Sequence, residues 1–129
     1  MHLTVEVSER EGAGGRLAQV VRIAGELDNT SYVAAQKALE PVIADPFPHV
    51  ILNLADLSYV SSAGVSVLLD ARKRLEAKKT TVAAIGMRPS IQKVFDIMQT
   101  LPASSVFASV AELDEYLAAI QDRANEPPE

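Results

Sequence analysis

The pattern of hydrophobic and polar residues changes along the chain. Leu3, Val5 and Val7 alternate with polar residues, which is typical of a strand with one buried face. A glycine-rich turn, EGAGG, separates this segment from LAQVVRIAG, so the pattern predicts a β-hairpin. Two later apolar runs, VILNL at 50–54 and TVAAIGM at 81–87, are nearly continuous, as expected for parallel strands covered on both faces.

Between these strands the spacing of apolar residues becomes helical. The segment YVAAQKALEPVIA at 32–44 predicts a helix that is either kinked or restarted at Pro41. A second helix follows YVSSAG, a third spans RPSIQKVFDIM at 88–98 and a fourth spans VAELDEYLAAIQ at 110–121. The short run SSVFAS at 104–109 predicts an edge strand.

The order of these elements predicts a single α/β domain. Its 129 residues suffice for one hydrophobic core, and strand–helix–strand connections of this length force parallel pairing. We therefore expect a mixed, mostly parallel sheet of about four to five strands with about four helices. The domain is expected over residues 1–122, with a polar, proline-rich and disordered tail at 123–129.

Small and polar residues gather in the loops that leave the strands. If these strands run parallel, GELDN, ADLSYVSSAG and GMRPS all lie at the carboxyl edge of the sheet, where open α/β sheets bind ligands. The middle loop contains Ser61, Ser62, Ala63 and Gly64 at the entrance to a helix. We expect the functional site at this edge.

Composition narrows the chemistry of that site. The net charge of −5 argues against nucleic acid as a partner, since phosphate binding requires a basic surface. The chain has no Cys, and its two histidines, His2 and His49, are not placed to activate a serine at the carboxyl edge. EGAGG lacks the lysine of a P-loop, and the scattered carboxylates predict no metal site. The chain has no signal-peptide pattern and no apolar span of about 20 residues, so we expect a cytoplasmic protein. Because the sites considered above are not supported, we also expect that it is not an enzyme and binds no cofactor.

The serines permit two interpretations. Ser61 or Ser62 is a helix N-cap worth about 1 kcal/mol, or one of them is a phosphorylation site. A phosphate at a helix start gains from the free N–H groups and the positive end of the helix dipole. An exposed hydroxyl flanked by Ala63 and Gly64 would be accessible to the active site of another protein.

Three motifs together resemble the STAS domain of anti-sigma-factor antagonists. They are GELD before the first helix, VILNLADLSYVSSAG and MRPSIQKVFDIMQTL. In that family the third-strand loop reads Asp, Ser, Ser or Thr, then Gly, and the first hydroxyl accepts phosphate. Aligned on Gly64, the resemblance implies that Ser62 is the acceptor, with Ser61 in place of the acid and as an alternative acceptor. Ala63 stands in place of the second hydroxyl.

The resemblance also implies partners. The unmodified domain would bind an anti-sigma factor that is a GHKL-type serine kinase, phosphorylation would end the complex, and a phosphatase would restore it. We expect the partner surface to include Ser61, Ala63 and Gly64 together with residues of the surrounding loops, which are Gly25, Glu26, Asp28, Asp56, Tyr59 and Arg88. Each has a structural alternative: Asp28 as a cap, Tyr59 as packing, Gly25 as a turn residue and Arg88 as an ordinary surface charge.

Two other functions stay open. The missing acid and Ala63 fit a STAS module that is never phosphorylated and that serves a larger signalling or transport assembly. A sensor that binds a small ligand at the same edge is a third reading, for which nothing in the chain selects a ligand.

Overall fold

A computed structural model describes residues 3–100 and 109–125. Within these ranges the chain forms five strands and four helices, in one sheet with packed helices, as predicted. The strands are β1 (Leu3–Gly12), β2 (Gly15–Leu27), β3 (His49–Asn53), β4 (Leu57–Val60) and β5 (Thr81–Ile85). The helices are α1 (Tyr32–Ala44), α2 (Ser62–Ala77), α3 (Pro89–Thr100) and α5 (Val110–Asn125).

The helix bounds follow local signals in the sequence. α3 begins at Pro89, a favoured first position for proline. α1 continues through Pro41 to Ala44 without interruption. α5 extends to Asn125, so the tail expected from residue 123 begins inside the helix. Of the edge strand expected at 104–109, all but Ser109 lies outside the described residues.

The sheet is mixed and mostly parallel, as predicted. β1 and β2 form an antiparallel hairpin that closes at Gly12 and Gly15. β2 runs parallel to β3 and to β4, and β3 runs parallel to β5. The order β1-β2-β3-β5 therefore places β2 and β3 in the middle of the sheet, with β4 beside the far end of β2.

β4 is a strand that the sequence pattern did not predict. The segment ADLSYVSSAG was expected to be a loop, but Leu57–Val60 pairs with Gly25–Leu27 of β2. Because β2 has 13 residues and β3 only 5, the end of β2 has pairing positions that β3 does not fill. A register shift lies between Gly25 and Glu26, and Gly25 has a φ of 99°, a value that favours glycine.

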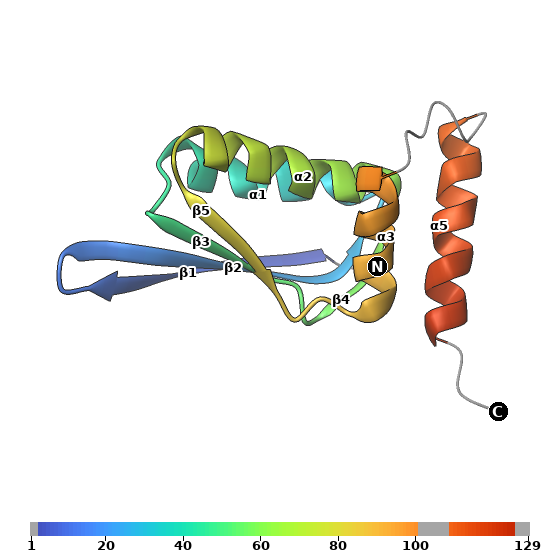
Figure 1. Cartoon of the computed structure of the whole chain (residues 1–129), viewed down its shortest axis with the longest axis horizontal. Helices are drawn as coiled ribbons and strands as arrows, with labels where there is room; N and C mark the ends of the chain where they lie inside the picture. Colours follow the sequence, from blue (N-terminus) through green and yellow to red (C-terminus); the bar gives the residue numbers. More distant parts are fainter. Residues whose placement is uncertain (1–2, 101–108, 126–129) are drawn as a thin grey trace.

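The main core lies between the sheet and the helices α1 and α2, which cover the same side of the sheet (Figure 1). Fully buried side chains come from both layers, including Val21, Ile23, Leu39, Leu68 and Leu75. α3 and α5 pack against each other beside the start of α2 (Figure 1). No helix in the described part of the chain has the length and apolarity needed to cross a membrane.

The prediction that 50–54 and 81–87 are covered on both faces was wrong. Val50 and Leu52 are buried, but the alternating Ile51 is only half-buried, and Ile85 at the end of β5 is 49% exposed. The physical reason is that α1 and α2 lie on one side of the sheet, so the opposite side of β3 and β5 stays accessible.

Candidate functional site

The junction between β4 and α2 is fixed by backbone hydrogen bonds to the end of β2. The N–H of Ser61 donates to the carbonyl of Leu27 (2.9 Å). The Oγ of Ser61 accepts the N–H of Gly64 (3.3 Å). Ser61 is therefore the N-cap of α2, and Ser62 is the first residue of the helix.

Ser62 is buried, against the expectation that it stands exposed. Only 7% of the residue is accessible, and Ser61 is 4% accessible. The N–H of Ser62 donates to Oδ1 of Asp114 on α5 (2.8 Å), so this helix lies against the start of α2. This contact joins residues 52 positions apart in the chain and brings α5 to the residue that carries the hydroxyl.

A second polar contact holds α5 on the same junction. Gln121 is completely buried, and its side chain accepts the N–H of Val60 (2.8 Å) and donates to the carbonyl of Val60 (2.7 Å). Leu113 and Leu117 of the same helix are buried in the core. α5 thus satisfies the backbone of Val60, the last residue of β4, through one side chain.

Asp114 and Gln121 were missed by the sequence analysis. Gln121 continues the row formed by Leu113 and Leu117, since each is four residues from the next and therefore lies on the same helix face. A glutamine on the apolar face of an amphipathic helix indicates a buried hydrogen-bond partner. No comparable signal marks Asp114, which lies one position off that row.

Gly64 allows α2 to approach β2 closely. A Cβ at this position would lie 2.4 Å from the carbonyl oxygen of Leu27 and 2.8 Å from its Cγ. Gly64 is buried inside the first turn of α2 and its φ is not positive. The requirement at this position is thus for space and not for conformational freedom.

Ala63 and Ser66 lie on the accessible side of the same turn. Ala63 is half-buried and Ser66 is exposed. With Tyr32, Gln36 and Asp70 they line a shallow groove of about 340 Å³ between α1 and α2. This groove is the open surface beside the start of α2.

The neighbouring loops are tied to each other. The N–H of Gly25 donates to the carbonyl of Asp56 (3.0 Å), and the side chain of Asp56 pairs with Arg22 (2.8 Å). Glu26 pairs with Tyr59 in the β2–β4 register, and its carbonyl accepts the hydroxyl of Ser31 (2.7 Å). The expected convergence of the first two loops is therefore present.

Arg88 lies in the turn before α3, in the third of these loops, which meets the second where the N–H of Leu54 donates to the carbonyl of Ile85 (2.9 Å). The carbonyl of Arg88 accepts the N–H groups of Ile91 and Gln92 (3.0 and 2.9 Å), which begins the helix. The residue is exposed. Its role in the described structure is that of a backbone acceptor at a helix start.

Asp28 stabilises the turn that enters α1. Its carboxylate accepts the N–H and the hydroxyl of Thr30 (2.9 and 2.7 Å). Burial by itself raises the pKa of Asp28, but the hydrogen bonds from Thr30 and Ser31 outweigh it and leave the pKa below its ordinary value. Asp28 therefore stabilises the turn before α1, but it is not the helix cap that the sequence suggested, because the N-cap of α1 is Ser31.

Replacing Asp28 with Ala is expected to lower the free energy of unfolding by about 1 kcal/mol at pH 7. A carboxyl with a lowered pKa in the folded chain stabilises the fold above its unfolded pKa, and this contribution is lost as the pH falls through the folded pKa. The difference from the parent should therefore shrink below about pH 3.9, the ordinary pKa of Asp. Urea unfolding at pH 7 and pH 3 measures it, with Asn29→Ala in the same turn as the control. An equal loss at both pH values would contradict the assignment.

Comparison with known proteins identifies the family. A family model described as the STAS domain matches residues 4–113. The chain belongs to the STAS domain family. The resemblance inferred from the three sequence motifs is thereby confirmed.

Two relatives of this STAS domain are named as anti-sigma factor antagonists. The anti-sigma F factor antagonist of Paenibacillus polymyxa is 26% identical over 98 residues, which are 75% of this chain and 80% of that protein. The anti-sigma-B factor antagonist of Staphylococcus epidermidis is 29% identical over 77 residues, 60% of this chain and 71% of that protein.

Solved structures agree with the fold. An anti-sigma factor antagonist from Mycobacterium paratuberculosis has a TM-score of 0.64 and 25% identity, over 94% of this chain and 96% of that one. The Bacillus cell fate determinant SpoIIAA in its phosphorylated form has a TM-score of 0.58 and 26% identity, over 74% and 82%. The unphosphorylated form of SpoIIAA has a TM-score of 0.57.

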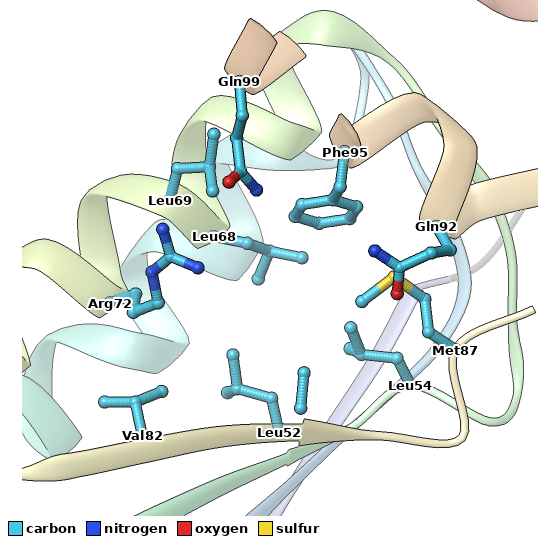
Figure 2. A pocket seen from close by; sticks show the side chains of 11 residues that line it. Leu52, Leu54, Leu68, Leu69, Arg72, Val82, Met87, Gln92, Phe95 and Gln99 are labelled. Atoms are coloured by element: carbon cyan, nitrogen blue, oxygen red, sulfur yellow. The ribbon is translucent and has the colours of Figure 1, made fainter. Parts of the chain in front are cut away.

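The STAS domain also contains a cavity of about 210 Å³ whose lining mixes apolar and polar residues and includes neither Ser61 nor Ser62. Figure 2 shows Leu52 and Val82 of the sheet on one side, Leu68 and Arg72 of α2 on another, and Phe95 of α3 opposite. The cavity has no carboxylate or histidine among its lining residues. His49 lies at the start of β3, whereas α2 follows from the opposite end of the sheet.

Proposed function

We propose that this STAS domain is an anti-sigma-factor antagonist that works by phosphorylation-controlled partner switching. With Ser62 unmodified, it binds an anti-sigma factor that is also a GHKL-type serine kinase. With Ser62 phosphorylated, it releases that partner. The observation that carries the proposal is a serine at the first position of α2, in a domain similar to SpoIIAA, whose structure is known with and without phosphate.

The chemistry is simple phosphoryl transfer, and the kinase supplies the catalytic groups. The γ-phosphoryl group of ATP moves to Oγ of Ser62, the hydroxyl proton passes to a base of the kinase, and ADP leaves. A phosphatase hydrolyses the ester with water and returns the serine and inorganic phosphate. In this role the antagonist provides a binding surface and an acceptor, binds no cofactor and catalyses nothing.

The surroundings of α2 support a protein-binding surface. The groove lined by Ala63, Ser66 and Tyr32 is open beside the acceptor. The residues expected to contact the partner are exposed or half-buried, except Ser61 and Gly64, which are buried and serve the fold; the others are Gly25, Glu26, Asp28, Asp56, Tyr59, Ala63 and Arg88.

Mapping the phosphate tests this function. The full chain is incubated with its cognate anti-sigma kinase and ATP, and the product is digested and sequenced by mass spectrometry. We expect one phosphate on Ser62, its loss in Ser62→Ala, and its retention in Ser61→Ala and in Ser66→Ala. Ser66 is the matched control because it is exposed and lies one turn further along α2. No phosphate on either Ser61 or Ser62 would rule out the switch.

A second candidate is a STAS binding module that is never phosphorylated. The burial of Ser62 favours it, since a kinase requires access to the hydroxyl. A pull-down that returned scaffold or transporter components and no kinase, together with an unphosphorylated Ser62, would support this module instead.

A further inference from the structure

We propose that helix α5 controls access to Ser62, and that phosphate on Ser62 in turn keeps α5 away from α2. This inference rests on the proposed phosphorylation of Ser62. Two states follow: a closed state, which the structure shows, and an open state in which α5 has left the β4–α2 junction. The kinase acts on the open state.

The closed state is defined by a contact that a phosphate would replace. The carboxylate of Asp114 accepts the N–H of Ser62 at 2.8 Å, at the positive end of the α2 dipole. A phosphate on the Oγ of Ser62 would seek the same N–H groups and carry up to two negative charges. The two anions would repel each other in a partly buried site, where solvent screens charges weakly. Phosphorylation therefore disfavours the docked position of Asp114.

The rest of α5 is held by contacts that break together. Gln121 makes two hydrogen bonds to Val60, and Leu113 and Leu117 join the core. If α5 leaves, the N–H and C=O of Val60 become available to solvent or to another protein. The same movement that exposes Ser62 therefore uncovers the end of β4.

In this scheme the position of α5 determines how fast the kinase phosphorylates Ser62. If the kinase recognises only the open state, the apparent rate of phosphorylation falls in proportion to the open fraction. Linkage is reciprocal: if phosphate stabilises the open state, opening stabilises the phosphorylated form by the same free energy. Weakening the contacts of α5 should thus accelerate the kinase reaction, and strengthening them should slow it.

A cysteine probe tests the gate without any kinase, because the chain has no native cysteine. Ser62→Cys should react with a thiol reagent at least tenfold more slowly than Ser66→Cys, which is exposed on the same helix. Adding Gln121→Ala should raise the rate at Cys in position 62 at least tenfold and leave the exposed control unchanged. Adding Gln92→Ala, a change of an exposed glutamine on α3, should alter neither rate.

Ala71→Cys separates local opening from unfolding. Ala71 is 2% exposed and lies in the middle of α2, where α5 departure alone would not reach it. In the Gln121→Ala background this probe should stay slow. Equal labelling of Ser62→Cys and Ser66→Cys in the otherwise unmodified chain would overturn the gate, as would labelling of Ala71→Cys and Ser62→Cys at the same raised rate.

A second experiment tests whether the negative charge of the phosphate displaces α5. In hydrogen exchange of the phosphorylated full chain, the amides of α5 should exchange at least tenfold faster than in the unmodified chain. Asp114→Asn keeps an oxygen acceptor for the N–H of Ser62 but removes the charge, so it should reduce this acceleration. Glu115→Gln, an equal charge change at an exposed neighbour, should not.

The outcomes separate the two proposals. If Ser62 is phosphorylated but α5 keeps its protection, and Gln121→Ala does not accelerate the kinase, the gate is wrong and the partner switch stands. If Ser62→Cys is shielded and Gln121→Ala exposes it, yet no variant accepts phosphate, α5 is a cover and the phosphate half of both proposals fails.

Discussion

Replacing Ser62 with Asp is expected to weaken binding of the anti-sigma factor by about a hundredfold or more. A new charge about 4 Å from an acid of the partner costs about 4 kcal/mol at an effective dielectric near 20, and about 1.4 kcal/mol already reduces affinity tenfold. The added carboxylate also opposes Asp114, so α5 is pushed away from the same surface. Isothermal titration of the purified partner measures the loss.

Two variants serve as controls for this prediction. Ser8→Asp adds the same charge at an exposed position on β1 and should leave the affinity within about threefold, or about 0.65 kcal/mol. Ser62→Ala should bind like the parent but accept no phosphate. If Ser62→Asp is folded, as judged by its thermal transition, and still binds like the parent, the electrostatic mechanism is wrong.

The second large effect concerns Gly64. Gly64→Ala is expected to lower the free energy of unfolding by about 1–3 kcal/mol, because the new methyl group meets backbone atoms that cannot rotate away. The first of these is the carbonyl oxygen of Leu27, only 2.4 Å from the added Cβ. That carbonyl also accepts the N–H of Ser61, so relief of the clash disturbs the N-cap of α2.

Thermal unfolding measures this change. For a chain of this size the expected loss corresponds to a lowering of the Tm by about 3–12 °C. Gly14→Ala is the matched control, since a Cβ there has nothing within 4 Å. If both variants melt at the temperature of the parent, the contact between α2 and β2 is looser than the structure indicates.

Much of the fold is visible in the sequence because its signals are local. The apolar spacing and flanking residues of 32–44 predict α1 with the bounds that it has, and Pro89 marks the start of α3. The β-hairpin and the central parallel strands follow from alternation, glycine and connection length. The motif around Ser61 and Ser62 placed a helix entrance at the correct residues.

Other features depend on pairing that no local pattern specifies. β4 forms because β2 extends beyond β3 and leaves positions open to Leu57–Val60. One face of β3 stays accessible because both α1 and α2 lie on the other side, although Ile51 on that face is apolar. An apolar run indicates that a strand is favoured in a buried position, but it does not show which of its faces helices will cover.

The serines show most clearly the difference between what local sequence determines and what tertiary packing determines. Short-range chemistry, a hydroxyl at a helix start followed by a glycine, located the candidate acceptor and the family to which the chain belongs. Its backbone N–H is bonded by Asp114, 52 residues later in the chain, and Gln121, 61 residues from Val60, holds α5 on the same junction. Helix periodicity shows which face of α5 is apolar, but which strand that face meets depends on the whole packed chain. The contact of Ser62 with α5 was therefore decided by the packing of the whole chain and not by the residues around the serine.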